Sequence, residues 1–215
     1  MNGEEALRVL EARVDTAWPQ EWRASCRTHH PGWLFKTWDA RSARELAARD
    51  FPFLLPAFDS YAHPVQRADA ARWMVMYQFG GVYADTDVEC LAPAGPSLAG
   101  RDLVFNCEEA PGAKDAPGNA VIASTPRNPF WLDVMREAMA RADDPAYSAH
   151  DNGFVRVLAT TGPWMVGDVL RRFLGLGPDG RFCGAALEAH GVRVAAYPVG
   201  SWFTPCAPMD AACEM

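Results

Sequence analysis

Residues 67–89 read RADAARWMVMYQFGGVYADTDVE, and this stretch decides the fold. Its first part predicts a helix over residues 66–79, because apolar side chains such as Trp73 and Tyr77 recur at helical spacing. Two glycines follow, as they commonly do where a helix ends. Residues 82–85 then predict a short buried strand. A helix that turns back into a buried strand is typical of α/β proteins.

Four charged residues in this stretch predict a binding site. Asp85 and Asp87 are two positions apart, so an extended chain points both carboxylates to the same side. Such oxygen ligands suit Mg²⁺ or Mn²⁺, and strand ends are where α/β sheets bind ligands. Asp69 and Arg72 share a helix face that can point toward the same end of the strand. Arg72 can orient a phosphate or a sugar hydroxyl, and Asp69 can accept hydrogen bonds from sugar hydroxyls.

Each of these features has an ordinary structural interpretation when it is taken alone. An isolated Asp-X-Asp usually marks a solvated turn. An aspartate and an arginine three positions apart are often a surface pair worth only about 0.3–0.5 kcal/mol. The order and spacing of the whole set favour a functional site.

Strands and helices alternate along the rest of the chain, which predicts an α/β fold with a mostly parallel central sheet. Residues 51–64 read as an irregular connection, and 151–153 as a turn. One domain is expected over residues 1–215. Further strands are predicted at residues 33–38, 103–106, 120–124 and 192–197, and further helices at 3–14, 41–49, 125–141 and 160–173.

The composition is that of a globular protein with 215 residues, of which 49% are hydrophobic and 22% are charged. The net charge of −7 disfavours nucleic acid as a partner, since phosphate contacts need clustered basic side chains. No apolar run approaches the ~20 residues of a transmembrane helix. The charged start of the chain does not resemble a signal peptide. We therefore expect a cytoplasmic protein, peripheral to a membrane if it contacts one.

Six cysteines are scattered without the close spacing of a zinc knuckle. In the absence of a secretion signal they are predicted to be reduced and mostly buried. The alternative is a disulfide in a secreted or lumenal form, with Cys206 and Cys213 as the nearest pair.

The same stretch resembles the signature of glycosyltransferase family 32, the DXD-containing sugar transferases. The family pattern is a helix with Asp and, three positions later, Arg, followed by Gly-Gly-x-Tyr-x-Asp-x-Asp. Other segments agree with the family, and the resemblance extends from about residue 18 to 202. They are Trp38-Asp39, residues 119–124, Thr161-Gly162-Pro163 and Tyr197-Pro198.

The resemblance implies a GT-A fold that binds a UDP- or GDP-linked sugar at the strand ends. It implies that Asp85 and Asp87 hold Mn²⁺ or Mg²⁺ on the donor diphosphate and, with Arg72, form the catalytic set. The implied donor contacts are Asp69, Arg72, Tyr83, Trp38 and Gly81. The acceptor would be a hydroxyl of a glycan, lipid or protein, as in polysaccharide biosynthesis, with retention of anomeric configuration. No protein nucleophile is assigned.

Two departures from the family pattern are expected to matter. The predicted helix at 3–14 occupies the place of the family's first strand, and the histidine-rich segment near the family's C-terminus has no counterpart. The chain is therefore expected to be shortened at both ends. The missing strand would leave an open sheet edge that a second copy could cover.

Two other functions stay open at this point. One is a scaffold that keeps the fold without turnover. The other is a haloacid-dehalogenase-like phosphohydrolase, in which Asp85 would be the nucleophile. That motif needs a later lysine, and Lys114 is the one available.

Overall fold

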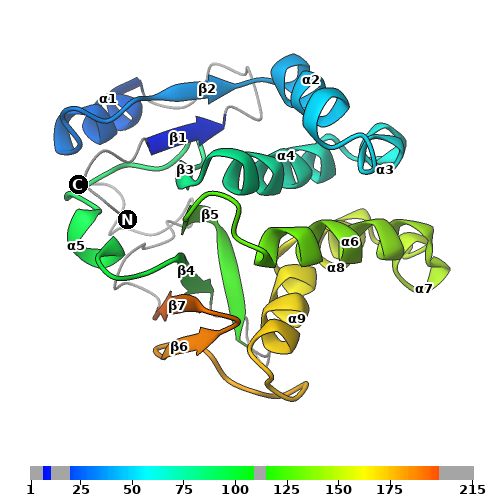
Figure 1. Cartoon of the computed structure of the whole chain (residues 1–215). Coiled ribbons are helices and arrows are strands. Elements are labelled where there is room, and N and C mark those ends of the chain that lie inside the picture. The colour runs from blue at the N-terminus through cyan, green and yellow to red at the C-terminus, as the bar shows by residue number, and fades with distance from the viewer. Residues whose placement is uncertain (1–6, 11–19, 109–114, 199–215) are drawn as a thin grey trace.

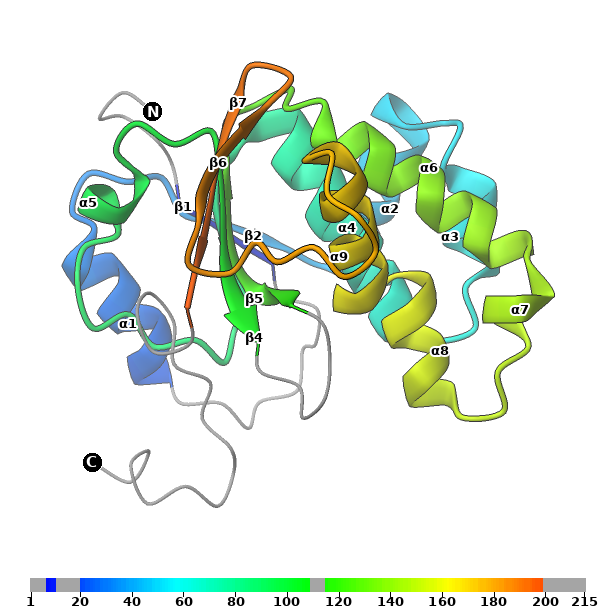
Figure 2. The same cartoon turned by 90° about the horizontal axis from the view of Figure 1, so that it is seen from below.

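The computed structural model describes residues 7–10, 20–108 and 115–198. They form a layered α/β structure, with one sheet between two groups of helices (Figures 1 and 2). Helices α1 (Gln20–His29) and α5 (Gly95–Leu98) lie on one side of the sheet. The larger group lies on the other side: α2 (Ala40–Asp50), α3 (Leu55–Ser60), α4 (Pro64–Phe79), α6 (Phe130–Asp143), α7 (Pro145–Ser148), α8 (Gly153–Thr160) and α9 (Pro163–Phe173).

The strand order among the described residues is β2-β1-β3-β5-β4-β7-β6. The strands are β1 (Leu7–Leu10), β2 (Lys36–Trp38), β3 (Gly81–Ala84), β4 (Leu103–Glu108), β5 (Ala116–Ser124), β6 (Ala186–Ala189) and β7 (Val192–Tyr197). The predicted α/β class is confirmed, but the sheet is mixed and not mostly parallel. β1 pairs in parallel with β2 and β3, and β4 with β7, whereas the pairs β3–β5, β4–β5 and β6–β7 are antiparallel. The connections β4–β5 and β6–β7 are too short for the crossover that parallel pairing requires.

The predicted N-terminal helix over residues 3–14 is wrong at its centre. Residues Leu7–Leu10 form strand β1, which lies between β2 and β3 and pairs in parallel with both. The rest of that predicted helix lies outside the described residues. Pairing on both sides outweighs the local helical pattern, since strand preference depends strongly on tertiary context. β1 therefore occupies the place of a first strand, so that departure from the family pattern disappears.

Helix α4 confirms the prediction made from its apolar spacing and begins two residues earlier, at Pro64. It ends at Phe79, and its C-cap Gly80 has a φ of +62°, which suits glycine. A Cβ atom at Gly80 would lie 2.5 Å from the backbone nitrogen of Pro126, so the turn into β3 also needs the absence of a side chain. Helix α2 is likewise confirmed, with Asp39 as its N-cap.

Two local predictions differ from the structure, whereas the predicted turn at residues 151–153 is present and leads into α8, with Asn152 as N-cap. The connection over residues 51–64 contains α3. Helix α6 begins at Phe130, not near Thr125, because the intervening segment forms a turn. In that turn Asn128 Oδ1 accepts a hydrogen bond from the Phe130 amide at 3.1 Å.

The central strands separate two hydrophobic clusters. Tyr83, Phe105 and Ile122 belong to the larger cluster, which also includes buried side chains of α4, α6 and α9. Val82 and Val104 belong to the smaller cluster, with Cys26 of α1 and Leu98 of α5. Alternate residues of each strand thus face opposite helix groups, which fixes the side to which Tyr83 points.

The prediction of reduced cysteines is wrong for four of the six. Cys26 bonds to Cys90 and Cys107 to Cys183, and no free cysteine occurs among the described residues. Their sequence separations are 64 and 76, so no local spacing could indicate the pairing. The alternative pair Cys206 and Cys213 lies outside the described residues.

Among the described residues, no helix is both long and apolar enough to cross a bilayer.

Candidate sugar-nucleotide site

Arg72 is the centre of a buried network at the carboxyl end of β3. Its Nη1 donates to Asp69 Oδ1 at 2.8 Å, and its Nη2 donates to Asp85 Oδ1 and to the Tyr83 hydroxyl, each at 3.2 Å. The guanidinium also lies over the Tyr83 ring, with Cζ 4.6 Å from the ring centre. The structure thus brings together four of the residues that the sequence singled out.

The backbone explains why these side chains meet. Asp69 and Arg72 are three positions apart on α4, so they share one helix face. The turn at Gly80 sends β3 back along α4, which places Asp85 opposite Arg72 although they are 13 positions apart. Tyr83 and Asp85 alternate with buried residues of the opposite face, and both point toward α4.

Asp69 has two further partners that the sequence analysis did not select as site residues. Its Oδ2 accepts a hydrogen bond from Thr161 Oγ1 at 2.9 Å, and its Oδ1 accepts one from Asn119 Nδ2 at 3.2 Å. Thr161 is the C-cap of α8, and Asn119 lies on β5. Burial raises the pKa of Asp69 to about 6, while the neighbouring Arg72 charge and the Thr161 hydrogen bond act in the opposite direction. The sequence indicates Thr161 only through the segment Thr161-Gly162-Pro163, which resembles the family pattern.

Asp85 and Asp87 form the mouth of the network. The Asp85 side chain is 29% exposed, and the Tyr83 hydroxyl donates a short hydrogen bond to its Oδ1. Partial burial raises the pKa of Asp87, and the negative charge of Asp85 adds to this effect. The two carboxylates therefore lie close enough to repel each other, which a cation between them would relieve.

Glu108 at the end of β4 adds another carboxylate. Burial raises the pKa of Glu108. The negative charge of Asp85 acts in the same direction, and the positive charge of Arg72 acts in the opposite direction. The described part of the site thus holds four carboxylates and the single guanidinium of Arg72. The carboxylates are those of Asp69, Asp85, Asp87 and Glu108. A divalent cation would balance this excess of negative charge.

The described residues contain no cluster of three or more His, Cys, Asp or Glu side chains arranged for a metal. Asp85 and Asp87 would thus supply part of a ligand shell, and a donor diphosphate and water would complete it, as Mg²⁺ commonly requires.

Two predicted donor contacts lie apart from this network. Gly81 begins β3 and lies four positions before Asp85. At ~3.3 Å per residue of a strand, the two residues are roughly 13 Å apart. Trp38 ends β2, two strands from β3, and its side chain is only 3% exposed. Its ring packs 5.5 Å from Phe79 with the Lys36 ammonium 3.8 Å from its centre. Contacts of Gly81 and Trp38 with a donor remain predictions.

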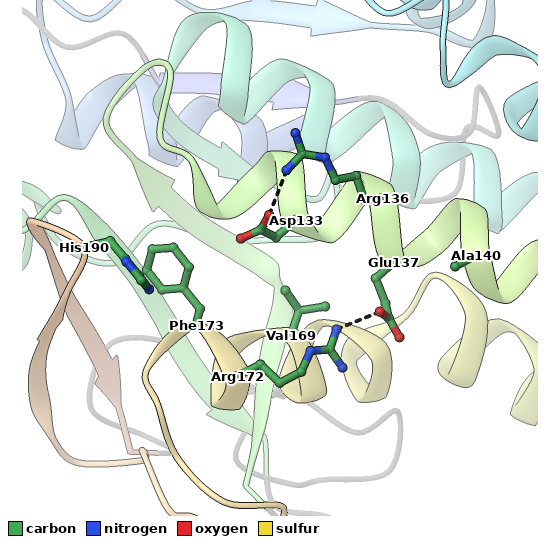
Figure 3. A pocket seen from close by; sticks show the side chains of 8 residues that line it. All are labelled: Asp133, Arg136, Glu137, Ala140, Val169, Arg172, Phe173 and His190. Atoms are coloured by element: carbon green, nitrogen blue, oxygen red, sulfur yellow. Dashed lines mark hydrogen bonds and ion pairs between the residues drawn. The ribbon is translucent and has the colours of Figure 1, made fainter.

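A surface cavity of about 450 Å³ lies elsewhere, between α6 and α9 and beside His190 of the β6–β7 turn (Figure 3). Its charged side chains are paired, Asp133 with Arg136 at 3.1 Å and Glu137 with Arg172 at 2.7 Å. It contains none of the network residues. The chemistry is therefore better placed at the strand end, where a guanidinium and several carboxylates are buried together.

Comparisons with known proteins agree with this placement. Residues 19–104 match the family model described as "glycosyltransferase sugar-binding region containing DXD motif". Inositol phosphoceramide mannosyltransferase 1 of Schizosaccharomyces pombe is 33% identical over 54% of this chain and 37% of its own length. Mannosyl phosphorylinositol ceramide synthase SUR1 of Saccharomyces cerevisiae is 32% identical over 55% of this chain and 30% of its own.

A solved structure supports the same fold. The PaToxG glycosyltransferase superposes with a TM-score of 0.55 over 79% of this chain and 69% of that chain, at 16% identity. The GT-A fold that the sequence resemblance implied is thus confirmed, and so is the resemblance to the DXD-containing glycosyltransferases. The chain spans only about a third of the length of the two curated relatives named above.

Proposed function

We propose that this chain is a glycosyltransferase that moves a sugar from a nucleoside diphosphate to a hydroxyl acceptor, with a divalent cation held by Asp85 and Asp87. One observation carries the proposal: the buried Asp69–Arg72–Tyr83–Asp85 network opens at the carboxyl end of β3. The matched DXD region includes all of these residues. The cation, when bound, would stabilise the negative charge that develops on the departing diphosphate.

We propose a task for each side chain of the network. Arg72 is held by Asp69, Tyr83 and Asp85, so its positive charge is preorganised beside the position where leaving-group charge develops. Asp69 is oriented by Thr161 and can accept from donor-sugar hydroxyls. Tyr83 holds Asp85 through its hydroxyl and leaves the Asp85 side chain open toward Asp87.

The donor sugar and acceptor are proposed from the relatives. Their names describe mannosyl transfer to inositol phosphoceramide, so a mannosyl donor is the first to test, linked to GDP or to UDP. The acceptor is a hydroxyl of a lipid headgroup or glycan. We further propose retention of the anomeric configuration, which proton NMR of the freshly formed product checks directly.

The phosphohydrolase alternative gains no support from the network. It gives Asp69 and Arg72 no role, although both belong to the network, and the lysine that it needs, Lys114, lies outside the described residues.

The first experiment measures thermal unfolding with UDP, GDP and their sugars, with and without Mn²⁺, for wild type and Asp87→Ala. A ligand at ~100 times its Kd stabilises the native state by about 2.7 kcal/mol. We expect one nucleotide to raise the Tm of wild type only with Mn²⁺ and to leave Asp87→Ala unchanged. Hydrolysis of the matching nucleotide sugar is then measured. Metal-dependent binding without hydrolysis or transfer would favour the scaffold function, and no shift with any nucleotide would contradict a donor site.

A further inference from the structure

We propose that the Cys26–Cys90 disulfide and helix α1 hold Asp87 in the position from which it binds the cation. This inference rests on the proposed function and adds positioning residues to it. We call residues 86–94 the Asp87 segment. It connects the end of β3 to α5, and it contains both Asp87 and Cys90.

The two aspartates of the motif are held from opposite sides of the sheet (Figure 2). Asp85 is bonded through its side chain to Arg72 of α4, and its amide donates to the Ala120 carbonyl at 2.8 Å. The Asp87 side chain has no hydrogen bond to another side chain within residues 20–108 and 115–198. Its position therefore depends on the backbone of the Asp87 segment, which is attached to α1.

The disulfide is the covalent anchor of the Asp87 segment. Cys90 follows Asp87 by three residues, which is at most ~11 Å along an extended chain. Its partner Cys26 lies on α1 and is buried in the same hydrophobic cluster as Val88. The Val88 amide donates to the Asp85 carbonyl at 3.2 Å, which closes a turn around Asp87. A shift of Cys90 away from α1 would therefore move the turn that presents the carboxylate.

Two backbone amides of the Asp87 segment donate to side chains of α1 and of the residue that follows it. The Cys90 amide donates to Ser25 Oγ at 2.9 Å, while the Ser25 hydroxyl itself donates to the Trp22 carbonyl at 2.7 Å. The Ala94 amide donates to His30 Nε2 at 2.9 Å. His30 Nδ1 faces a backbone carbonyl at 2.8 Å and so carries the ring hydrogen, which leaves Nε2 as an acceptor. Both acceptors are thus oriented by the helix they come from.

This attachment bears on cation binding because Asp85 and Asp87 carry like charges. Before a cation is present the two carboxylates repel each other, and a loosely held segment would let them separate. The anchors on α1 oppose that separation, so both carboxylates stay within reach of one ion. Groups that orient a metal ligand in this way raise the affinity of the site. Loss of the anchors should weaken cation binding and leave the contacts of Arg72 in place.

The test compares Cys26→Ser/Cys90→Ser with Cys107→Ser/Cys183→Ser. The two disulfides have sequence separations of 64 and 76, so their removal should cost comparable stability. The control removes a bond of β4, where pairing with β5 keeps Glu108 in place. Affinity for Mn²⁺ is measured by electron paramagnetic resonance, without nucleotide and with GDP or UDP, at a temperature where all variants are folded.

We expect the Kd for Mn²⁺ to rise about 10–100-fold in Cys26→Ser/Cys90→Ser, as loss of groups that orient a metal ligand implies. The control should bind Mn²⁺ like wild type. A purely structural disulfide would lower the Tm of the metal-free protein and leave the Kd of the folded protein unchanged.

The Ser25→Ala variant tests the same anchor with the disulfide intact, so it decides the matter if the double variant does not fold. Its matched control is Thr28→Ala, because the Thr28 hydroxyl donates to the Ala24 carbonyl within α1 at 3.1 Å. We expect Ser25→Ala to raise the Kd for Mn²⁺ about twofold or more, as loss of one hydrogen bond implies. Thr28→Ala should leave it unchanged.

Hydrogen exchange of the metal-free protein reports the anchoring itself. Peptides that cover residues 86–94 should exchange faster in Cys26→Ser/Cys90→Ser and in Ser25→Ala, whereas peptides of α4 should exchange as in wild type. Unchanged exchange of the Asp87 segment, or an unchanged Kd for Mn²⁺ in both variants, overturns this inference alone. Absence of Mn²⁺ binding to wild type contradicts the proposed function, and this inference with it.

Discussion

Thr161 Oγ1 donates a hydrogen bond to Asp69 Oδ2 at 2.9 Å, across 92 positions of sequence, and both side chains are buried. This bond ties the end of α8 to the middle of α4 at the point where the donor sugar is proposed to bind. It also fixes the carboxylate that holds Arg72. Thr161 is therefore a positioning residue for the network.

The Thr161→Val variant tests this role. Valine keeps the shape of the side chain but removes a donor from a buried carboxylate, so the free energy of unfolding should fall by about 1–3 kcal/mol. Affinity for the nucleotide sugar should fall as well, because Asp69 loses its orientation. Urea denaturation and the nucleotide thermal shift measure the two effects. Thr161→Ser keeps the hydroxyl and should retain donor affinity near that of wild type, and equal donor affinity in the valine variant would contradict the assignment.

The Asp69–Arg72 ion pair predicts a non-additive response to mutation. Arg72→Met leaves the Asp69 carboxylate buried without its countercharge, and loss of one partner of a buried pair typically costs about 3–5 kcal/mol. Asp69→Asn/Arg72→Met removes both charges and should recover much of that stability. Transfer activity should be lost in both variants, because the positive charge is absent. Equal stability of the single and double variants, measured by denaturation, would rule out the coupling.

Local patterns predicted the centre of the molecule well. The apolar spacing of α4, the glycines after it and the paired aspartates are all local signals, and they correctly predicted a helix, a turn and a strand. Asp69 and Arg72 were placed on one face by helix geometry alone. The contact of Arg72 with Asp85 also follows from the short turn, because the two glycines let the strand turn back along the helix.

The periphery depends on tertiary pairing that no local pattern contains. β1 is a strand because β2 and β3 offer it backbone partners on both sides. The apolar spacing of residues 3–14 on its own favours a helix. Thr161 and Asn119 reach Asp69 from distant segments, so only the folded chain or the family pattern could indicate them. The disulfides join residues more than sixty positions apart for the same reason.

The two disulfides predict sensitivity to reduction. Cys26–Cys90 joins α1 to the segment after Asp87, and Cys107–Cys183 joins β4 to the segment before β6. Closing loops of this size restricts the unfolded chain, so loss of each bond should lower the free energy of unfolding by about 2–4 kcal/mol. Cys26→Ser/Cys90→Ser and Cys107→Ser/Cys183→Ser are compared by denaturation with and without dithiothreitol.

Alkylation of the unfolded, unreduced protein provides the control. Iodoacetamide should leave all four of these cysteines unmodified by mass spectrometry until a reductant is added. Modification before reduction would show that the pairs do not form.

The Asp102–Arg193 pair predicts how stability depends on acid. Asp102 Oδ2 accepts from Arg193 Nε at 2.7 Å and Oδ1 accepts from Nη2 at 2.8 Å, which joins the start of β4 to β7. These hydrogen bonds lower the pKa of Asp102, so the folded state favours its ionised form. The resulting stability is present above the ordinary aspartate pKa of ~3.9 and is lost as pH falls through the lower folded-state value.

Asp102→Asn should therefore be less stable than wild type at pH 7, by about 0.5–1 kcal/mol because Arg193 is half exposed. The difference should shrink as the pH falls below the ordinary aspartate pKa of ~3.9 and through the lower folded-state pKa of Asp102, where the wild-type carboxylate becomes protonated as well. Asp59→Asn is the matched control, since Asp59 makes the same two-point contact with Arg44 but both side chains are exposed. Solvent screens that pair, so its removal should change stability little at either pH. Denaturant midpoints at pH 7 and pH 2.5 measure both variants, and a difference between Asp102→Asn and wild type that grows on acidification would show that the folded state does not favour the ionised carboxylate.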